Sequence, residues 1–420
     1  MSSNARNFAN QVSNLIQIST GGSDFVTPEV LSASIANIDL SLYATNAQLS
    51  ASVGNINMSS AIVTASSAAV AELNNRIIIS SASPSTGING QIWIDPTTAS
   101  TPVLSILGSS TWTTPRVGRV KAIGGTVTYS GAYTVHTFLG SSTFTSFQPL
   151  SVEYLVVAGG GGGGTWGGGG GGGGGVRSSI AGQPSGGGSS AESTGIISSG
   201  TYQVVVGAGG TGSTLSPGDN SSFHNITSLG GGGGGGTITG STWLNADSGG
   251  CGGGATWVYN GSNGVGGLGT SGQGFAGGTC TWVNTGFHAS AGGGGSGQVG
   301  QSPANSDAPS GNGGNGTQIN ANGISYYWGG GGGGGMHDYS GTQISGNGGL
   351  GGGGGGSGGE VFGTGGGSAL NAGQNGQVGS SKLGGNGGGN TGGGGGSGSA
   401  GQAANGGNGG SGIVILRYLT

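Results

Sequence analysis

Uninterrupted glycine runs fill much of the second part of this chain and restrict its fold more than any other feature. Glycine makes up 114 of the 420 residues, and only 11 of these lie before residue 159, so residues 159–420 hold the remaining 103. Ordering a glycine costs roughly 0.5–1 kcal/mol more than ordering an alanine. An ordered fold here therefore requires dense hydrogen bonding between backbones. The pure runs are 159–164, 167–175, 230–236, 329–335, 351–356 and 392–396.

Two structures suit such a composition, a flexible linker and a lattice of packed glycine helices. Polyproline-II-type helices have three residues per turn and no internal hydrogen bonds. Such helices, when they lack side chains, can therefore pack side by side and hydrogen-bond to one another. Gly-rich composition is typical of flexible linkers. Disordered tails, however, are usually rich in Lys, Glu and Pro, which are scarce here, and aromatic segments recur between the runs. We therefore expect a lattice, with pure glycine runs at its centre and Gly-Gly-X segments at its rim.

The first part of the chain has ordinary composition and carries a heptad pattern. Seven apolar residues recur every seven positions from Ile35 to Ile77, which is typical of a left-handed coiled coil. The pattern predicts a homotrimeric, parallel coiled-coil shaft over residues 31–79; a single amphipathic helix on a globular domain is the alternative. The expected trimerisation residues are Ile35, Ile38, Leu42, Leu49, Ile56, Val63, Val70, Leu73 and Ile77.

Around this shaft the sequence predicts an attachment segment and small β modules. Residues 1–30 are polar and mildly amphipathic, as an attachment peptide or a frayed end would be. Residues 80–158 alternate β-rich runs, near 91–96, 103–107, 110–112 and 152–157, with Gly breaks. The apolar run 412–419 is the expected partner of 152–157. The predicted fold class is mostly irregular and β: a helical coiled coil, β modules, then a polyglycine-II lattice over 159–420 closed by a C-terminal strand.

Charge and motif content argue against several classes of function. Eight cations against twelve acids give a net charge of −4, which does not suit nucleic-acid binding. No apolar run is long enough to insert in a membrane, and no signal peptide is evident, so synthesis in the cytoplasm is expected. Cys251 and Cys280 either pair or remain as free buried thiols. Ser357 matches a nucleophile elbow, a match expected by chance among so many glycines. We expect that the protein binds no metal and no cofactor and that it is not an enzyme.

Three segments carry a resemblance to a known family. Residues 144–159 with the glycines that follow, residues 202–210 and residues 409–418 resemble the glycine-rich domain of bacteriophage tail fibres and tail-tip adhesins. Residues 90–93 are similar to small β modules along phage fibres. The resemblance implies a virion protein with a polyglycine-II sandwich, whose variable loops contact the host receptor. Some relatives are separate monomeric tips, whereas this chain carries its own heptad segment.

Specificity on a scaffold without side chains must come from the inserted loops. These loops are rich in aromatic residues, which bury large areas at binding surfaces and stack on sugars; the alternative is that they cover the lattice ends as a minor core. The expected receptor-binding residues are Trp166, Trp243, Trp257, Tyr259, Trp282, Phe287, His288, Tyr326, Tyr327, Trp328, His337 and Tyr339.

The sequence thus predicts a virion tail fibre that recognises a host polysaccharide or outer-membrane protein. Its expected partners are two further copies of itself and, through residues 1–30, other tail or baseplate proteins. A purely structural tail whisker is the first alternative. A non-viral glycine-rich surface or ice-binding protein is the second.

Overall fold

The computed structural model describes thirteen stretches of the chain, one of which, 120–237, crosses the boundary between its two compact units, Met1–Val120 and Lys121–Thr420. The first unit is described only at 77–79, 92–95, 103–108, 111–113 and 120. The second is described at 121–237, 243–257, 263–281, 288–305, 308–336, 344–358, 361–378, 382–399 and 404–420.

The first unit contains one four-stranded sheet. Its strands are β1 (Ile77–Ile79), β2 (Ile92–Asp95), β3 (Val103–Gly108) and β4 (Thr111–Thr113), in that order across the sheet. β1 pairs with β2 in parallel, and the other pairs are antiparallel. Strands expected near 91–96, 103–107 and 110–112 are present.

The predicted fold class is wrong in its helical coiled coil. The described residues contain no α-helix, and Ile77, the last heptad position, lies in β1 opposite Ile92. Three consecutive isoleucines at 77–79 favour a strand, because β-branched side chains fit a pleated surface. The predicted homotrimer depended on this coiled coil and therefore loses its basis. The other expected trimerisation residues lie outside the described residues, as does the segment 1–30: Ile35, Ile38, Leu42, Leu49, Ile56, Val63, Val70 and Leu73.

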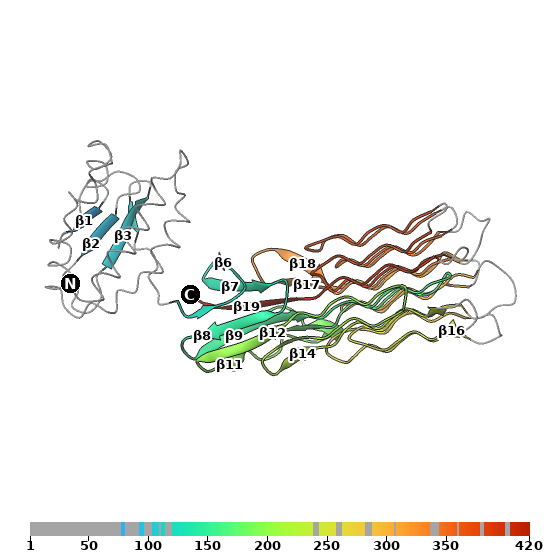
Figure 1. Cartoon of the computed structure of the whole chain (residues 1–420), viewed down its shortest axis with the longest axis horizontal. Helices are drawn as coiled ribbons and strands as arrows, with labels where there is room; N and C mark the ends of the chain where they lie inside the picture. The colour runs from blue at the N-terminus through green and yellow to red at the C-terminus, as the bar shows by residue number, and fades with distance from the viewer. Residues whose placement is uncertain are drawn as a thin grey trace. The chain divides into compact units, whose positions relative to one another are not determined.

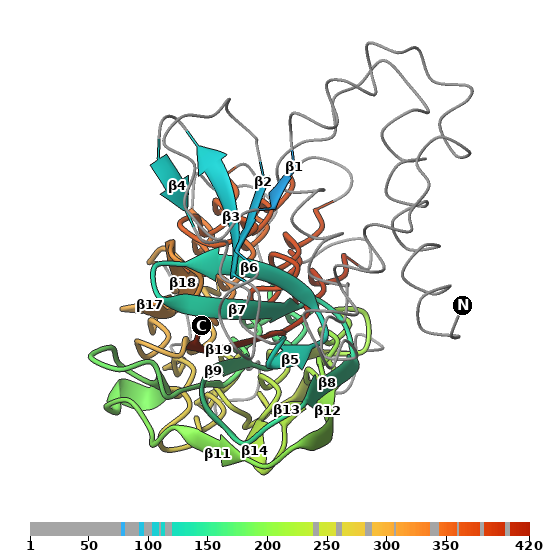
Figure 2. The same cartoon turned by 90° about the vertical axis from the view of Figure 1, so that its left-hand side faces the viewer.

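Two antiparallel sheets form one end of the second unit (Figure 1). Figure 2 shows β6, β7, β19 and β9 following one another across the larger sheet. Its strands are β10 (Val176–Ser178), β9 (Leu150–Val157), β19 (Ile413–Leu419), β7 (Tyr133–Phe138) and β6 (Thr126–Ser130), with β11 (Gly195–Ile197) also paired to β9. The smaller sheet consists of β14 (Ile226–Ser228), β13 (Ser221–Phe223), β12 (Gly200–Val205), β8 (Ser142–Ser146) and β5 (Ala122–Ile123).

Three short elements complete the second unit. The hairpin of β17 (Thr317–Asn320) and β18 (Ser325–Trp328) packs at the sheet end, and a second hairpin joins β15 (Gly236–Thr237) to β16 (Trp243–Leu244). A 3₁₀ turn, η2, spans Gly186–Gly188.

The expected pairing of the strands that open and close the glycine region is confirmed. β9 and β19 are antiparallel neighbours, with Val157 opposite Ile413 and Tyr154 opposite Leu416. Both strands are buried on both faces, which is why they read as continuous apolar runs rather than alternating ones. One face packs in a core with Phe144 and Phe223, and the other packs against Trp328. The C-terminal strand therefore lies inside the sheet rather than at its edge.

The glycine segments extend side by side away from these sheets (Figure 1), and their hydrogen bonds repeat every three residues. Within the run 169–175, the amides of residues 169, 172 and 175 donate to the carbonyls of 235, 232 and 229. The amides of 170 and 173 donate to 291 and 294, and those of 171 and 174 donate to 395 and 392. This period belongs to an extended helix with three residues per turn, whose bare faces each contact a different neighbour. The backbone groups that glycine leaves exposed are thereby paired.

Segments at the rim of the lattice carry one exposed side chain every three residues. In residues 404–410, Asn405 and Asn408 are exposed while Gly407 and Gly410 are buried. The rim asparagines also bond across helices: Asn408 Oδ1 accepts from the Gly212 amide at 3.0 Å, and Asn386 Oδ1 accepts from the Asn408 amide at 2.7 Å. The amide side chains therefore satisfy backbone donors at the edge of the lattice.

The two cysteines are free and buried in the lattice. Burial raises the pKa of both thiols to about 12, so neither forms a reactive thiolate at neutral pH. Of the two possibilities that the sequence left open, the structure contains the free buried thiols.

Candidate functional site

The ends of the glycine segments opposite the sheets form a surface that we call the loop end. β16 lies there (Figure 1), and β15 beside it pairs Thr237 with Trp243. Hydrogen bonds join the neighbouring segments at this level. The Gly167 amide donates to Gly398 O at 2.8 Å, and the Gly335 amide donates to Gly168 O at 3.0 Å. The loop end is thus a continuous base built from segments far apart in sequence.

Buried serine and threonine hydroxyls form the floor of the loop end. Ser290 Oγ donates to Gly167 O, Ser397 Oγ to Gly164 O at 3.0 Å, and Ser399 Oγ to Met336 O at 3.0 Å. A hydroxyl can satisfy a carbonyl at the point where the neighbouring glycine run stops supplying an amide. Sequence reasoning missed this layer, although its signal is visible as Ser or Thr directly after a run, at Thr165, Ser357 and Ser397. Ser357 belongs to the layer: its Oγ donates to Gln377 O at 2.6 Å.

Trp257 and His288 are two predicted site residues that the structure brings together at the loop end. Their rings stack with centroids 4.2 Å apart and planes 8° apart. The Trp257 amide donates to Ser290 Oγ at 3.1 Å, so the pair stands on the hydroxyl floor. His288 has φ +58°, a left-handed conformation. Trp257 is itself buried, with 7% of its surface exposed, so the half-buried His288 ring is the part of this pair that is open to a ligand.

Trp166 and Trp243 also belong to the loop end. Trp166 lies in the turn between the first two glycine runs, half-buried and with φ +58°. Trp243 is the first residue of β16. The remaining loop aromatics lie outside the described residues: Tyr259, Trp282, Phe287, His337 and Tyr339.

Tyr326, Tyr327 and Trp328 lie at the sheet end instead, in β18. Trp328 is fully buried, and its Nε1 donates to Ile319 O at 3.2 Å. It packs with Val135 and Leu155, and Tyr326 meets its ring edge-on with centroids 5.7 Å apart. The hairpin covers one face of the larger sheet, so Trp328 is a core residue and is unavailable to a receptor.

Exposed apolar side chains surround the base of the loops, a feature that sequence reasoning did not select. Ile344 and Val361 form a bridge between two returning segments, and Ile344 is 48% exposed. A contiguous apolar patch would mark an interaction surface, and in this set the bridge places Ile344 beside Val361. The set comprises Leu244, Ile344, Val361, Phe362, Val378 and Leu383.

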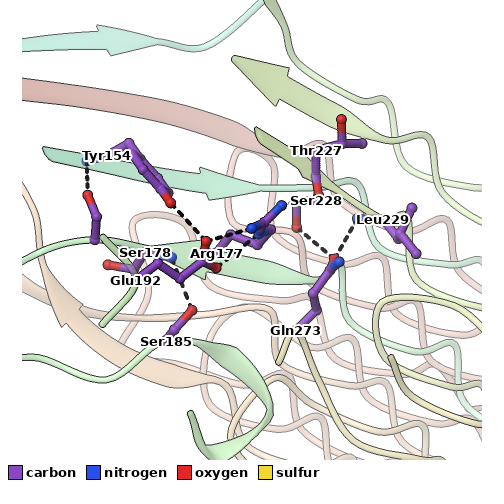
Figure 3. Close-up of polar contacts among 10 residues, drawn as sticks. Tyr154, Arg177, Ser178, Ser185, Glu192, Thr227, Ser228, Leu229 and Gln273 are labelled. Carbon is purple, nitrogen blue, oxygen red and sulfur yellow. Dashed lines mark hydrogen bonds and ion pairs between the residues drawn. The ribbon is translucent and has the colours of Figure 1, made fainter. Parts of the chain in front are cut away.

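The charged groups of the sheet end are used for structure. Arg177 pairs with Glu192 through two bonds, Nε to Oε1 at 2.9 Å and Nη2 to Oε2 at 2.6 Å (Figure 3). The Tyr154 hydroxyl donates to Glu192 Oε2 at 2.8 Å, and burial together with this carboxylate raises the pKa of Tyr154. Arg417 likewise holds Glu153 at 2.6 Å. Both glutamates therefore form ion pairs with arginines of the sheet end.

Gln273 brings the glycine region into the same contacts. Its Oε1 accepts from the Leu229 amide at 2.8 Å, and Arg177 Nη1 donates to Thr227 O at 3.3 Å (Figure 3). The sheet end and the lattice are thus fixed to each other around β10 and β14.

Within the described stretches, no three His, Cys, Asp or Glu side chains gather as metal ligands would. The same part of the chain holds no helix with the length and apolar character needed to cross a bilayer. Neither the models of known protein families nor the sequences of curated proteins match this chain.

Proposed function

We infer that this chain is a phage tail-fibre adhesin that binds a host surface molecule through the loop end. The observation that carries the proposal is the loop end itself, where a hydrogen-bonded floor presents aromatic and exposed apolar side chains. The resemblance of residues 144–159 and 409–418 to tail-fibre domains gives the class of protein. Binding without catalysis agrees with the engagement of Glu153 and Glu192 by arginines.

The position of the chain's entry and exit supports the same proposal. Lys121 Nζ donates to Leu419 O at 2.9 Å, so the start of the second unit and the C-terminal strand meet at the sheet end. The loop end lies at the opposite end of the glycine segments (Figure 1). An adhesin needs this polarity, with attachment at one end and contact at the other. Residues 1–30 are proposed to join other tail or baseplate proteins.

The test is binding of the labelled full chain to intact cells of a strain on which the phage grows. Trp166→Asn and His288→Asn remove aromatic rings and keep a residue that tolerates positive φ. We expect each to weaken saturable binding by about tenfold or more, the loss of roughly 1.4 kcal/mol typical of an interface anchor.

Tyr129→Ala is the matched control, because Tyr129 is an aromatic residue 74% exposed on β6, at the sheet end. It should leave binding unchanged. If the folded chain binds no cell, or if only Tyr129→Ala weakens binding, the loop end is not the receptor site, and a structural tail fibre becomes the better assignment.

A further inference from the structure

Asn-Gly steps recur along the rim of the lattice, and they are chemically labile. In such a step the glycine backbone nitrogen can attack the asparagine side-chain amide, because glycine places no side chain in the way. Asparagine is accordingly among the thermally labile residues of proteins. The described Asn-Gly steps begin at Asn263, Asn312, Asn315, Asn322, Asn347, Asn375, Asn386, Asn405 and Asn408.

Most rim steps have both reacting groups held by hydrogen bonds. At Asn386-Gly387, the Gly387 amide donates to Asn408 O at 2.8 Å. The Asn386 side chain accepts from the Asn408 amide at 2.7 Å and donates to Gln374 Oε1 at 3.0 Å. The attacking Gly387 nitrogen is thus held by one hydrogen bond, and the Asn386 side-chain amide is held by two. Attack therefore requires local opening of the lattice.

Asn405-Gly406 departs from this pattern, and Asn408-Gly409 in the same helix provides the comparison. The Gly412 and Gly409 amides donate to Gly207 O and Gly210 O at 2.9 and 2.8 Å. Continuing this series by three residues would pair the Gly406 amide with the carbonyl of Ser213. Ser213, however, lies in a turn at 212–215, where the segment that follows Gly207 leaves its helix.

No described residue accepts a hydrogen bond from the Gly406 amide or bonds the Asn405 side chain, whereas Asn408 Oδ1 is held by Gly212. Asn405 is exposed.

We propose that Asn405 is a site of spontaneous deamidation in the folded protein, while Asn386 and Asn408 are protected by the lattice. The Gly406 nitrogen loses its proton to solvent and forms a bond to Asn405 Cγ. The Cγ–Nδ2 bond breaks, and ammonia leaves with the proton it requires. Water then opens the resulting succinimide to aspartate or isoaspartate.

The product would alter the base of the loop end. Either product adds one negative charge, and isoaspartate also lengthens the backbone by one methylene. The Asn405 carbonyl accepts from the Gly384 amide at 3.1 Å, so the lesion acts on two adjacent segments. A resulting loss of receptor binding rests on the proposed function; the chemical modification does not.

Peptide mapping of the aged full chain tests the proposal. Cleavage by trypsin after Lys382 and Arg417 releases one peptide, 383–417, which contains all three asparagines in the same Asn-Gly-Gly context. The intact protein is incubated at neutral pH, and electron-transfer fragmentation distinguishes isoaspartate at each position. We expect Asn405 to convert faster than Asn386 and Asn408 by at least about tenfold, equivalent to only about 1.4 kcal/mol of protection.

The urea-unfolded chain is the control, and there the three residues should convert at similar rates. Equal rates in the folded protein would overturn the proposal, and so would an Asn405 excess that persists in urea, because that would be a sequence effect. In cell-binding assays, Asn405→Gln should resist loss of activity on ageing, whereas Asn408→Gln should age like the parent. If only the cell-binding result differs from this expectation, the proposed loss of receptor binding is wrong, while the deamidation of Asn405 stands.

Discussion

His136 is a titratable side chain enclosed in the core between the two sheets. Its Nδ1 lies 2.7 Å from Gly124 O, which can only accept, so Nδ1 carries the proton. Its Nε2 lies 3.1 Å from the Tyr418 hydroxyl and accepts from it in the neutral ring. The ring also meets Phe144 edge-on, with centroids 5.1 Å apart. Burial lowers the pKa of His136 below its ordinary value of 6.5, partly offset by the bond to Gly124.

The stability of the second unit should therefore fall as pH drops below about 6.5. In that range the unfolded chain binds a proton that the folded chain excludes, so the free energy of unfolding rises with pH, by at most about 1.4 kcal/mol per pH unit for one group. Urea unfolding of the parent and of His136→Gln between about pH 5 and pH 8 measures this slope. A variant slope equal to that of the parent would show that His136 is not the group responsible.

At the scale of an element, the glycine helix tolerates side chains only where its face is open to solvent. A Cβ at Gly171 would overlap the Gly161 carbonyl oxygen. Gly389 is an exposed residue of the turn 389–392, where a Cβ would meet nothing within 4 Å, and this glycine has no positive φ. The same substitution should consequently have opposite effects at the two positions.

Gly171→Ala should destabilise the protein by about 1–3 kcal/mol or more, because the lattice cannot shift one helix without disturbing its other neighbours. Gly389→Ala should be neutral or stabilising by about 0.4–1 kcal/mol, since it reduces the freedom of the unfolded chain. Melting temperatures measured side by side decide between these effects. Equal shifts for both variants would show that the central helices are not packed backbone to backbone.

At the scale of the whole molecule, folding of the second unit depends on the last strand of the chain. β19 lies between β9 and β7 and pairs with both. Ile413 and Ile415 pack on one face of the sheet, while Val414 and Leu416 pack on the other. The glycine region leaves the sheet after β9 and returns to it at β19, so this pairing closes the entire lattice.

Deletion of residues 413–420 should abolish folding of the glycine region, because it exposes two central strand edges and removes side chains from both cores. The measurement is limited proteolysis of the purified chain, with deletion of Thr420 alone as the control. The Thr420 deletion removes one backbone bond, to Ala132 O, and should retain the protected core. A protease-resistant 159–411 fragment from the longer deletion would contradict this prediction.

The sequence by itself determined which segments open and close the glycine region, because strands buried on both faces read as continuous apolar runs. It also indicated that the amides and carbonyls of the glycine runs must hydrogen-bond to neighbouring segments, because glycine has no side chain to pack. Only the tertiary structure decided that Ile77 belongs to a strand and that Trp328 belongs to the core, because a heptad or an aromatic cluster does not reveal its partner. The loop end and, among the described residues, the unpaired amide beside Asn405 likewise depend on which glycine segments are neighbours. The sequence does not reveal these neighbours, because the glycine runs are identical in composition.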